Sequence, residues 1–234
     1  MKIKKLTDKE YWDKNYVGSS KLNYLPSYDS LDLQTKLELL KIISNYSKGD
    51  NVLEIGAGDS DFLIYLASKN KEKSYAGMDY SDFGCENLIQ RSKNLNIKLN
   101  VINEDLFTND SIYFDQFSMV YSLGVVEHFD DLANVLNNTK RYCKSNGYHF
   151  ALIPNMSGIY GLITKIIDRE VYDIHVPHDL ESFVKGHKDA NMEIVIANYY
   201  GFFNASLLSS CRPFRNKNSF FRILYKALRL ITKI

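Results

Sequence analysis

A chain of 234 residues has room for one sizeable α/β domain and is short for two independent ones. Its 45% hydrophobic and 24% charged residues are typical of a globular protein, and no apolar run approaches the ~18 residues of a membrane span. A net charge of only +1 argues against a general nucleic-acid binder, which would carry a clear excess of basic residues.

Residues 1–50 are predicted to form an N-terminal helical and aromatic cap segment. Leucines and isoleucines recur at helical spacing in Leu33–Tyr46, which predicts a helix packed on the domain that follows. Met1–Trp12 lacks the apolar stretch of a secretory signal. The chain's three cysteines stand singly, as is typical of free thiols in a reducing compartment. We therefore expect a cytoplasmic protein without nucleic-acid partners.

Residues 51–210 are predicted to form the main domain, because short β-rich runs alternate with helix-length segments. The predicted strands are Asn51–Ile55, Ser74–Asp79, Lys98–Asn103, Phe114–Tyr121 and Gly147–Ile153, and the helices between them are Asp61–Ser68, Asp82–Leu95 and Asp131–Cys143. This alternation predicts a Rossmann-like, mostly parallel sheet with helices on both faces. The carboxyl ends of its strands would share one edge, where a ligand binds.

The second half of the chain is less regular. The connection at 155–178 is too long for a turn and is predicted to be an insert that covers the substrate. Asp179–Lys188 is predicted to be a helix, and Met192–Tyr199 and Phe202–Leu208 are predicted to be two further strands.

Residues 211–234 are predicted to form a basic amphipathic helix. No acidic residue follows Glu193, and four cations fall on one helical stripe opposite an apolar face; the cations are Arg222, Lys226, Arg229 and Lys233, and the apolar residues Phe220, Leu224, Ala227 and Ile231. Such a helix either packs on the domain with its charges in water or contacts a membrane surface or an anionic substrate. The sequence leaves both interpretations open.

The first strand runs into a glycine-rich turn, Glu54–Asp61, of the kind that lets a nucleotide-like ligand approach the backbone. A dinucleotide-binding turn would have glycine at position 61, whereas this turn carries two carboxylates, Asp59 and Asp61. Carboxylates repel a pyrophosphate and attract a cation, so they favour S-adenosylmethionine over a nicotinamide cofactor.

Polar residues also stand at or just after the ends of the next three predicted strands. Asp79, followed by Tyr80, can accept hydrogen bonds from ribose hydroxyls, and Asp105, followed by Leu106, can hold an adenine ring. The fourth strand ends near Ser122 and continues into Glu127-His128. Asp79 or Asp105 alone could be a helix cap, but their joint occurrence favours a cofactor site.

These four segments resemble the cofactor motifs of class I S-adenosylmethionine-dependent methyltransferases, especially the small-molecule and glycan-type branch with Glu-His and Pro-Asn after its fourth and fifth strands. The resemblance implies a seven-stranded sheet whose last strand is antiparallel. It also implies a cofactor site that comprises Glu54, Gly56, Ala57, Gly58, Asp61, Asp79, Tyr80, Asp105, Leu106 and Ser122. Ser60 replaces a glycine that many members have, and the motif of many nucleic-acid amino-methyltransferases is absent.

His128, aided by Glu127, is the predicted base for a hydroxyl acceptor; alternatively, His128 only packs or caps the next helix. No metal is expected, because Gly124 stands where a metal-dependent RNA-methylating branch has a further carboxylate.

Asn155, His175 and His178 are predicted to face the substrate. In many relatives an N-terminal aromatic segment folds over the cofactor, and Tyr11, Trp12 and Tyr16 resemble it; core packing is the alternative.

The sequence thus predicts a methyltransferase that acts on oxygen in a small molecule, a sugar, or a nucleotide- or lipid-linked glycan. The composition resembles that of enzymes of bacterial surface-polysaccharide synthesis. The alternatives are a methyltransferase of a small amine or amino sugar, and a cofactor-binding partner protein without activity.

Overall fold

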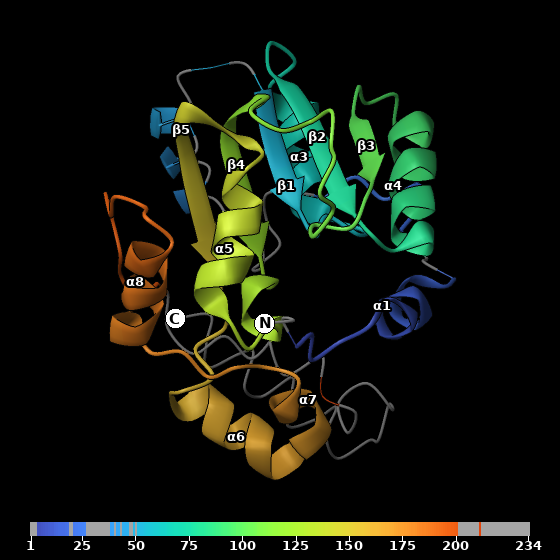
Figure 1. Cartoon of the computed structure of the whole chain (residues 1–234). Coiled ribbons are helices and arrows are strands. Elements are labelled where there is room, and N and C mark those ends of the chain that lie inside the picture. Colours follow the sequence, from blue (N-terminus) through green and yellow to red (C-terminus); the bar gives the residue numbers. More distant parts are fainter. Residues whose placement is uncertain are drawn as a thin grey trace. The chain divides into compact units, whose positions relative to one another are not determined.

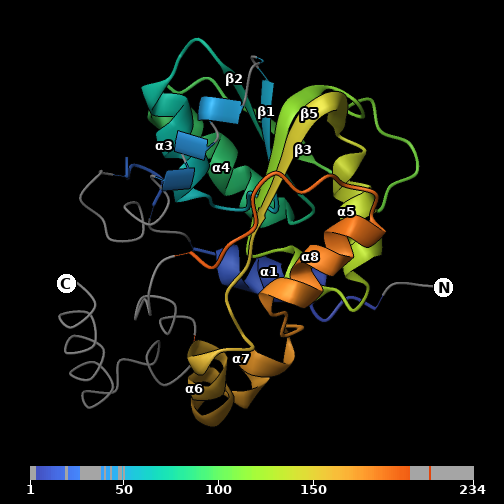
Figure 2. The same cartoon turned by 90° about the vertical axis from the view of Figure 1, so that its left-hand side faces the viewer.

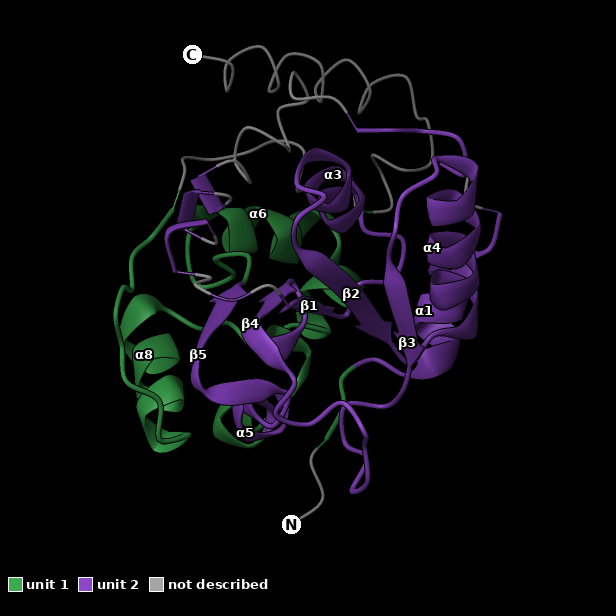
Figure 3. Ribbon diagram, turned by 90° about the horizontal axis from the view of Figure 1, so that it is seen from above, with its two compact units in different colours: residues 1–6, 127–134, 153–234 green, residues 7–126, 135–152 purple. Residues whose placement is uncertain are grey.

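A computed structural model of the chain describes residues 4–18, 21–26, 38–39, 41–42, 44–46, 49, 51–200 and 211. The chain divides into two compact units (Figure 3). The smaller unit contains residues 1–6, 127–134 and 153–234, and the larger contains residues 7–126 and 135–152.

The larger unit is built on a parallel sheet (Figure 1). Its strands are β1 (Asn51–Ile55), β2 (Ser74–Asp79), β3 (Asn100–Asn103), β4 (Phe117–Leu123) and β5 (Cys143–Leu152). They lie in the order β3-β2-β1-β4-β5, and every neighbouring pair is parallel. The chain direction across the sheet reverses between β1 and β4, which is where an open α/β sheet leaves a crevice for a ligand.

Helices cover both faces of this sheet (Figure 2). α3 (Asp61–Lys69) and α4 (Asp82–Asn94) lie on one face, and the part of α5 (Leu132–Lys140) that belongs to this unit lies on the other. Ser60 and Ser81 cap α3 and α4, each accepting a hydrogen bond from a backbone N–H three residues later. Both helices therefore begin directly after the turns that leave β1 and β2. α1 (Lys9–Tyr16) packs against α4.

The core of the larger unit lies between β1, β4 and α3. Val52 and Phe62 are fully buried, and Phe62 packs edge-on against Tyr121 with their ring centroids 5.8 Å apart. Six successive residues of α3, from Phe62 to Ala67, are buried, so the helix is covered on nearly all sides. This packing fixes the carboxyl ends of β1 and β4, where the predicted site lies.

The smaller unit contains α6 (Ile159–Ile167), α7 (Arg169–Asp173) and α8 (Leu180–Asp189), together with the 3₁₀ turn η1 (Val126–His128) from Glu127 onward. The segment 127–130 lies between two backbone partners. The Val176 N–H donates to the carbonyl of Glu127 at 2.7 Å, and the Leu6 N–H donates to that of His128 at 2.9 Å. An antiparallel bridge joins Lys5 and Phe129. Glu127 and His128 are thus fixed by backbone contacts on both sides.

The prediction of seven strands with an antiparallel last strand is not met, since the described residues form five strands in one parallel sheet. Met192–Tyr199 is not a strand in the structure. Ile194–Ala197 is a continuous apolar run, but Val195 and Ile196 are 56% and 54% exposed, so no core surface holds the segment in a sheet. The other predicted strand, Phe202–Leu208, lies outside the described residues.

The predicted β1 and β2 match the structure at both ends, and the other elements differ by a few residues. The connection at 155–178 is not an open loop, because it contains α6 and α7. Residues 38–39, 41–42 and 44–46 are helical, as predicted for Leu33–Tyr46, whereas the rest of that helix and the helix Phe220–Ile234 lie outside the described residues. None of the described helices is long and apolar enough to span a membrane.

Candidate active site

The glycine-rich turn leaves the carboxyl end of β1 and bends back onto β2. The N–H groups of Gly56 and Ala57 both donate to the carbonyl of Met78, at 2.8 and 3.0 Å. Gly56 has a φ of +69°, and a Cβ on it would come within 2.4 Å of the Val125 side chain. Only glycine fits this turn, because it allows the left-handed backbone and leaves room for the loop after β4.

Asp79 closes β2 and holds the turn in place. Its carboxylate accepts hydrogen bonds from the N–H groups of Gly58 at 2.8 Å and Ser81 at 2.9 Å. Burial raises the pKa of Asp79 to about 6, although these backbone hydrogen bonds act in the opposite direction. A carboxylate buried beside the glycine turn is suited to a ligand that offers hydroxyl donors or positive charge.

Glu54 lies inside the unit and joins three segments. Its Oε2 accepts hydrogen bonds from the Tyr121 hydroxyl at 2.7 Å and from the Ser60 hydroxyl at 2.9 Å. Glu54 therefore fixes the turn to β4 as well as being a predicted cofactor residue. Ser122, the next residue of β4, is 1% exposed, and its hydroxyl has no hydrogen-bond partner among the described residues. A buried hydroxyl without a partner marks the switch point between β1 and β4 as a place for a polar ligand.

The two carboxylates of the turn, Asp59 and Asp61, are neutralised by an arginine that the sequence analysis missed. The guanidinium of Arg91 on α4 is fully buried and lies 3.2 Å from Asp59 and 2.6 Å from Asp61. It also donates two hydrogen bonds to the carbonyl of Tyr24, at 3.0 and 2.9 Å. Asp61 also pairs with Lys21 at 3.2 Å. These ion pairs weaken the inference that Asp59 and Asp61 attract a cationic cofactor, and they give both residues a structural role.

The predicted adenine residues lie after β3. Asp105 is exposed, and its carboxylate accepts a hydrogen bond from the Phe107 N–H at 3.0 Å, while Leu106 is buried. Tyr80 follows Asp79, and its side chain hydrogen-bonds to Thr7. Burial raises the pKa of the Tyr80 phenol above its ordinary value, so Tyr80 stays neutral.

The predicted aromatic cover lies next to the turn through Tyr16. A Cβ on Gly58 would meet the Tyr16 hydroxyl at 2.2 Å, so this ring lies directly over the turn. Trp12 stacks on Tyr16 with ring centroids 6.1 Å apart, and Tyr11 contacts Trp12 edge-on at 5.2 Å. Asp13, which the sequence analysis did not single out, accepts a hydrogen bond from the Ser81 hydroxyl at 2.5 Å. The helix α1 is thereby attached to the start of α4 beside Asp79.

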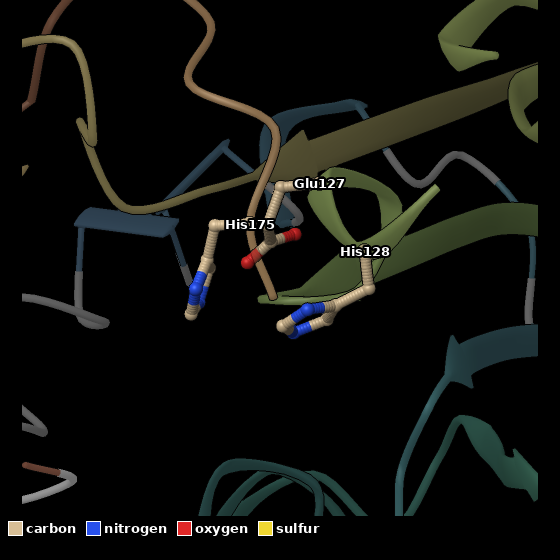
Figure 4. A group of neighbouring side chains, drawn as sticks. All are labelled: Glu127, His128 and His175. Carbon is tan, nitrogen blue, oxygen red and sulfur yellow. The ribbon is translucent and has the colours of Figure 1, made fainter. Parts of the chain in front are cut away.

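Glu127, His128 and His175 form a cluster within the smaller unit (Figure 4). Their potential ligand atoms all lie within 4.8 Å of one another, and the two imidazole centroids are 4.6 Å apart. Nδ1 of His128 lies 2.6 Å from the carbonyl of Ile174, and Nδ1 of His175 lies 2.6 Å from that of Val171. A carbonyl only accepts, so each Nδ1 carries the proton and each neutral ring has its lone pair on Nε2.

The electrostatics of this cluster keep it neutral in the absence of a ligand. Burial raises the pKa of Glu127 to about 8. Burial and the neighbouring His175 lower the pKa of His128 to about 4, and burial also lowers the pKa of His175. The Oε2 atom of Glu127 is buried without a hydrogen-bond partner among the described residues. Near neutral pH both histidines can accept a hydrogen bond or bind an ion through Nε2.

The other two predicted substrate residues lie elsewhere in the smaller unit. The Ser157 hydroxyl donates to the exposed Asn155 side chain at 2.8 Å and to the carbonyl of His178 at 3.2 Å. His178 packs against Phe183 with ring centroids 6.1 Å apart, and its buried Nε2 has no partner among the described residues. His178 is not a member of the Glu127 cluster, whereas His175 is.

The comparisons with known proteins agree with the fold. Residues 53–149 match the sequence profile of a family described as "Methyltransferase domain". These residues form a methyltransferase domain. The matched segment contains the glycine turn, Asp79, Asp105 and the Glu127-His128 pair, which are the motifs that led to the same assignment from sequence. This match supports the prediction of a class I methyltransferase domain.

Solved structures share the fold at low sequence identity. The methyltransferase domain resembles geranyl diphosphate C-methyltransferase from Streptomyces coelicolor A3(2), with a TM-score of 0.55, 10% identity, and 78% of each chain covered. The plantazolicin methyltransferase BpumL, solved with S-adenosylhomocysteine, matches with a TM-score of 0.52 at 18% identity, over 76% of this chain and 68% of that one. The chain spans 45% of the length of coclaurine N-methyltransferase, at 19% identity over 64% of this chain and a TM-score of 0.48. No curated protein matches the sequence.

Proposed function

We propose that the protein transfers a methyl group from S-adenosylmethionine to a hydroxyl oxygen of a small molecule. The observation that carries this proposal is the tautomer of His128, whose Nδ1–H donates to a backbone carbonyl and leaves Nε2 as an acceptor. An amine that is already neutral can attack a methyl group without a base, whereas a hydroxyl must lose its proton. A buried, neutral histidine next to Glu127 provides the acceptor for that proton.

The residues around the glycine turn fit S-adenosylmethionine. Asp79 is a buried carboxylate beside the turn, and the buried hydroxyl of Ser122 has no hydrogen-bond partner among the described residues. We assign Asp79 to the ribose, Asp105 and Leu106 to the adenine, and Tyr11, Trp12 and Tyr16 to the cover. Ala57, Tyr80, Glu54 and Asp61 support the same turn and its neighbours through the contacts described above.

The chemistry requires positioning more than strong acid or base catalysis. S-adenosylmethionine supplies the methyl group on a sulfonium, whose sulfur takes the electron pair of the broken C–S bond. The acceptor oxygen forms the new bond to the methyl carbon, and its proton passes to Nε2 of His128. The hydrogen bond to the Ile174 carbonyl fixes the imidazole and keeps its proton on Nδ1, so Nε2 is the ring atom that takes the proton.

The acceptor class that we favour is a sugar or a nucleotide- or lipid-linked glycan of surface-polysaccharide synthesis. Seven cations and no acidic residue follow Glu193, which suits an acceptor that carries phosphate or an anionic membrane surface. Neighbours in fold are named for chemically diverse molecules, geranyl diphosphate for one and plantazolicin for another. N-methylation of a small amine or amino sugar is the second candidate, and a partner protein without turnover is the third.

The experiment is an acceptor screen with S-adenosylmethionine that carries an isotope-labelled methyl group. Purified protein is incubated with sugars, nucleotide sugars, lipid-linked sugars and amino sugars, and products are identified by mass spectrometry and their methylated atom by NMR. Label on a hydroxyl oxygen supports the proposal, and label on nitrogen replaces it with the second candidate. Tight cofactor binding without labelled product from any acceptor class, including the protein's own lysate, favours the third.

A further inference from the structure

We propose that Glu127, His128 and His175 form a binding site for one divalent transition-metal ion. All three residues belong to the smaller unit, so the site does not depend on how the two units are placed. The sequence offers only the adjacent pair Glu127-His128. The fold adds His175 as the third residue with a potential ligand atom (Figure 4).

The donor set fits such an ion in chemistry. Two neutral imidazole nitrogens and one carboxylate oxygen are ligands that zinc, manganese, cobalt and iron accept, whereas magnesium prefers oxygen donors. Both imidazoles donate Nδ1–H to backbone carbonyls at 2.6 Å. This arrangement is typical of the histidine ligands of metal sites, because the hydrogen bond fixes the ring and directs Nε2 at the ion.

The distances require a small closure of the cluster. Ligand atoms roughly 2.0–2.2 Å from a tetrahedral ion lie about 3.4 Å from one another. The widest separation in the cluster is at most 4.8 Å, so closure needs a movement of about 1.4 Å at most. Rotation of the Glu127 side chain can bring its carboxylate closer to the two rings, because its Oε2 has no hydrogen-bond partner among the described residues.

An unexplained buried carboxylate oxygen is the second observation that points to a ligand. Glu127 is 1% exposed, its Oε2 has no hydrogen-bond partner, and no lysine or arginine pairs with it among the described residues. A buried carboxylate normally has a cation or several donors as partners. A bound ion would supply that partner. His175 is partly exposed and forms the side of the cluster that solvent reaches.

The proposed ion deepens the proposed function, because an ion held by these residues would lower the pKa of an acceptor hydroxyl that binds to it. With the ion bound, Nε2 of His128 would be a ligand and could not take the proton, so the proton of an ion-bound hydroxyl would pass to solvent instead of to His128. Metal binding is nevertheless tested without cofactor or acceptor. If no metal binds, the proposal of methyl transfer with His128 as the base still stands. If the acceptor screen gives no methylated product, the result of the metal titration is unaffected.

The experiment is calorimetric titration of chelator-treated, full-length protein with ZnCl₂, MnCl₂ and MgCl₂, followed by the visible spectrum with CoCl₂. We expect one Zn²⁺ or Mn²⁺ per chain, no comparable binding of Mg²⁺, and a cobalt absorption that indicates nitrogen ligands. Glu127→Gln and His175→Asn should each lower the affinity at least about 10-fold. Thermal unfolding verifies that both variants are folded.

His187→Asn is the matched control. His187 is also partly buried, and its Nδ1 lies 2.8 Å from the carbonyl of Phe183, four residues earlier. His175 makes the same kind of contact, since its Nδ1 lies 2.6 Å from the carbonyl of Val171, also four residues earlier. It is not a member of the cluster. This variant should therefore bind the ion as the wild type does. The proposal is overturned if no ion binds stoichiometrically, or if Glu127→Gln and His175→Asn bind it as tightly as His187→Asn.

Discussion

Replacement of Arg91 by methionine is expected to destabilise the larger unit strongly. Methionine matches the length and apolar stem of arginine but removes the guanidinium. The substitution leaves Asp59 and Asp61 without their shared cation and the Tyr24 carbonyl without two donors. The side chains of Arg91 and Asp59 are 0% and 9% exposed, so water cannot take over these interactions without local rearrangement.

The size of the effect follows from this burial. Removing one partner of a buried ion pair costs about 3–5 kcal/mol, because the remaining charge stays buried and uncompensated. The Asp61 side chain is 29% exposed, so water screens part of its charge and we expect the lower end of that range, about 3 kcal/mol. Since total stabilities are about 5–15 kcal/mol, the variant should still fold at low temperature.

The measurement is urea unfolding at pH 7, followed by circular dichroism and by tyrosine fluorescence. Arg91→Lys keeps a charge but not the planar group that reaches both carboxylates and the carbonyl, so it should lie between wild type and Arg91→Met. Lys9→Met is the control, because the Lys9–Asp82 pair is exposed on both sides, at 44% and 55%. It should leave the unfolding midpoint unchanged. A loss below about 1 kcal/mol in Arg91→Met would refute the reasoning, since it would place Arg91 among surface ion pairs.

Three further predictions concern the site. Asp79→Ala should weaken S-adenosylmethionine binding by roughly 1.5–3 kcal/mol in calorimetry, because charge-assisted hydrogen bonds are lost; unchanged affinity would exclude Asp79 from the ribose site. His128→Ala should lower turnover about 100-fold or more while cofactor affinity stays near normal, and full activity would leave His128 a packing residue. The pKa of His128 is lowered to about 4, so its contribution to stability is present above pH 6.5 and is lost as the pH falls toward 4, by up to about 3 kcal/mol. Burial of Glu127 acts in the opposite direction in this pH range, so the test is the difference between chelator-treated wild type and His128→Gln in urea unfolding, which should change with pH by this amount; equal slopes in the two proteins would contradict the cause assigned to the pKa.

The local sequence determined the framework of the methyltransferase domain. The apolar runs at β1 and β2 are short and bounded by turn residues, and Ser60 and Ser81 cap the helices that follow. These signals lie within a few residues of one another, so they could be interpreted without knowing the fold. The carboxyl ends of parallel strands share one edge, which is why the glycine turn and Asp79 could be placed together from sequence.

The late strands could not be predicted in the same way. Ile194–Ala197 is a continuous apolar run, as in a buried strand, but whether such a segment joins a sheet depends on a partner strand and a covered face. The charge of the glycine turn was also misjudged. Asp59 and Asp61 look unpaired along the chain, and only the packing of α4 shows that a buried arginine lies between them.

The sequence by itself determined that this chain contains an S-adenosylmethionine-dependent methyltransferase domain, because each cofactor motif is a short segment at the end of one strand. Only the tertiary structure decided what surrounds those motifs. His175 lies 47 positions after His128, yet a 2.6 Å hydrogen bond from His128 to Ile174 brings it into the same cluster as Glu127. Contacts between residues so far apart depend on the path of α6 and α7, and the spacing of residues along the chain carries no signal for that path.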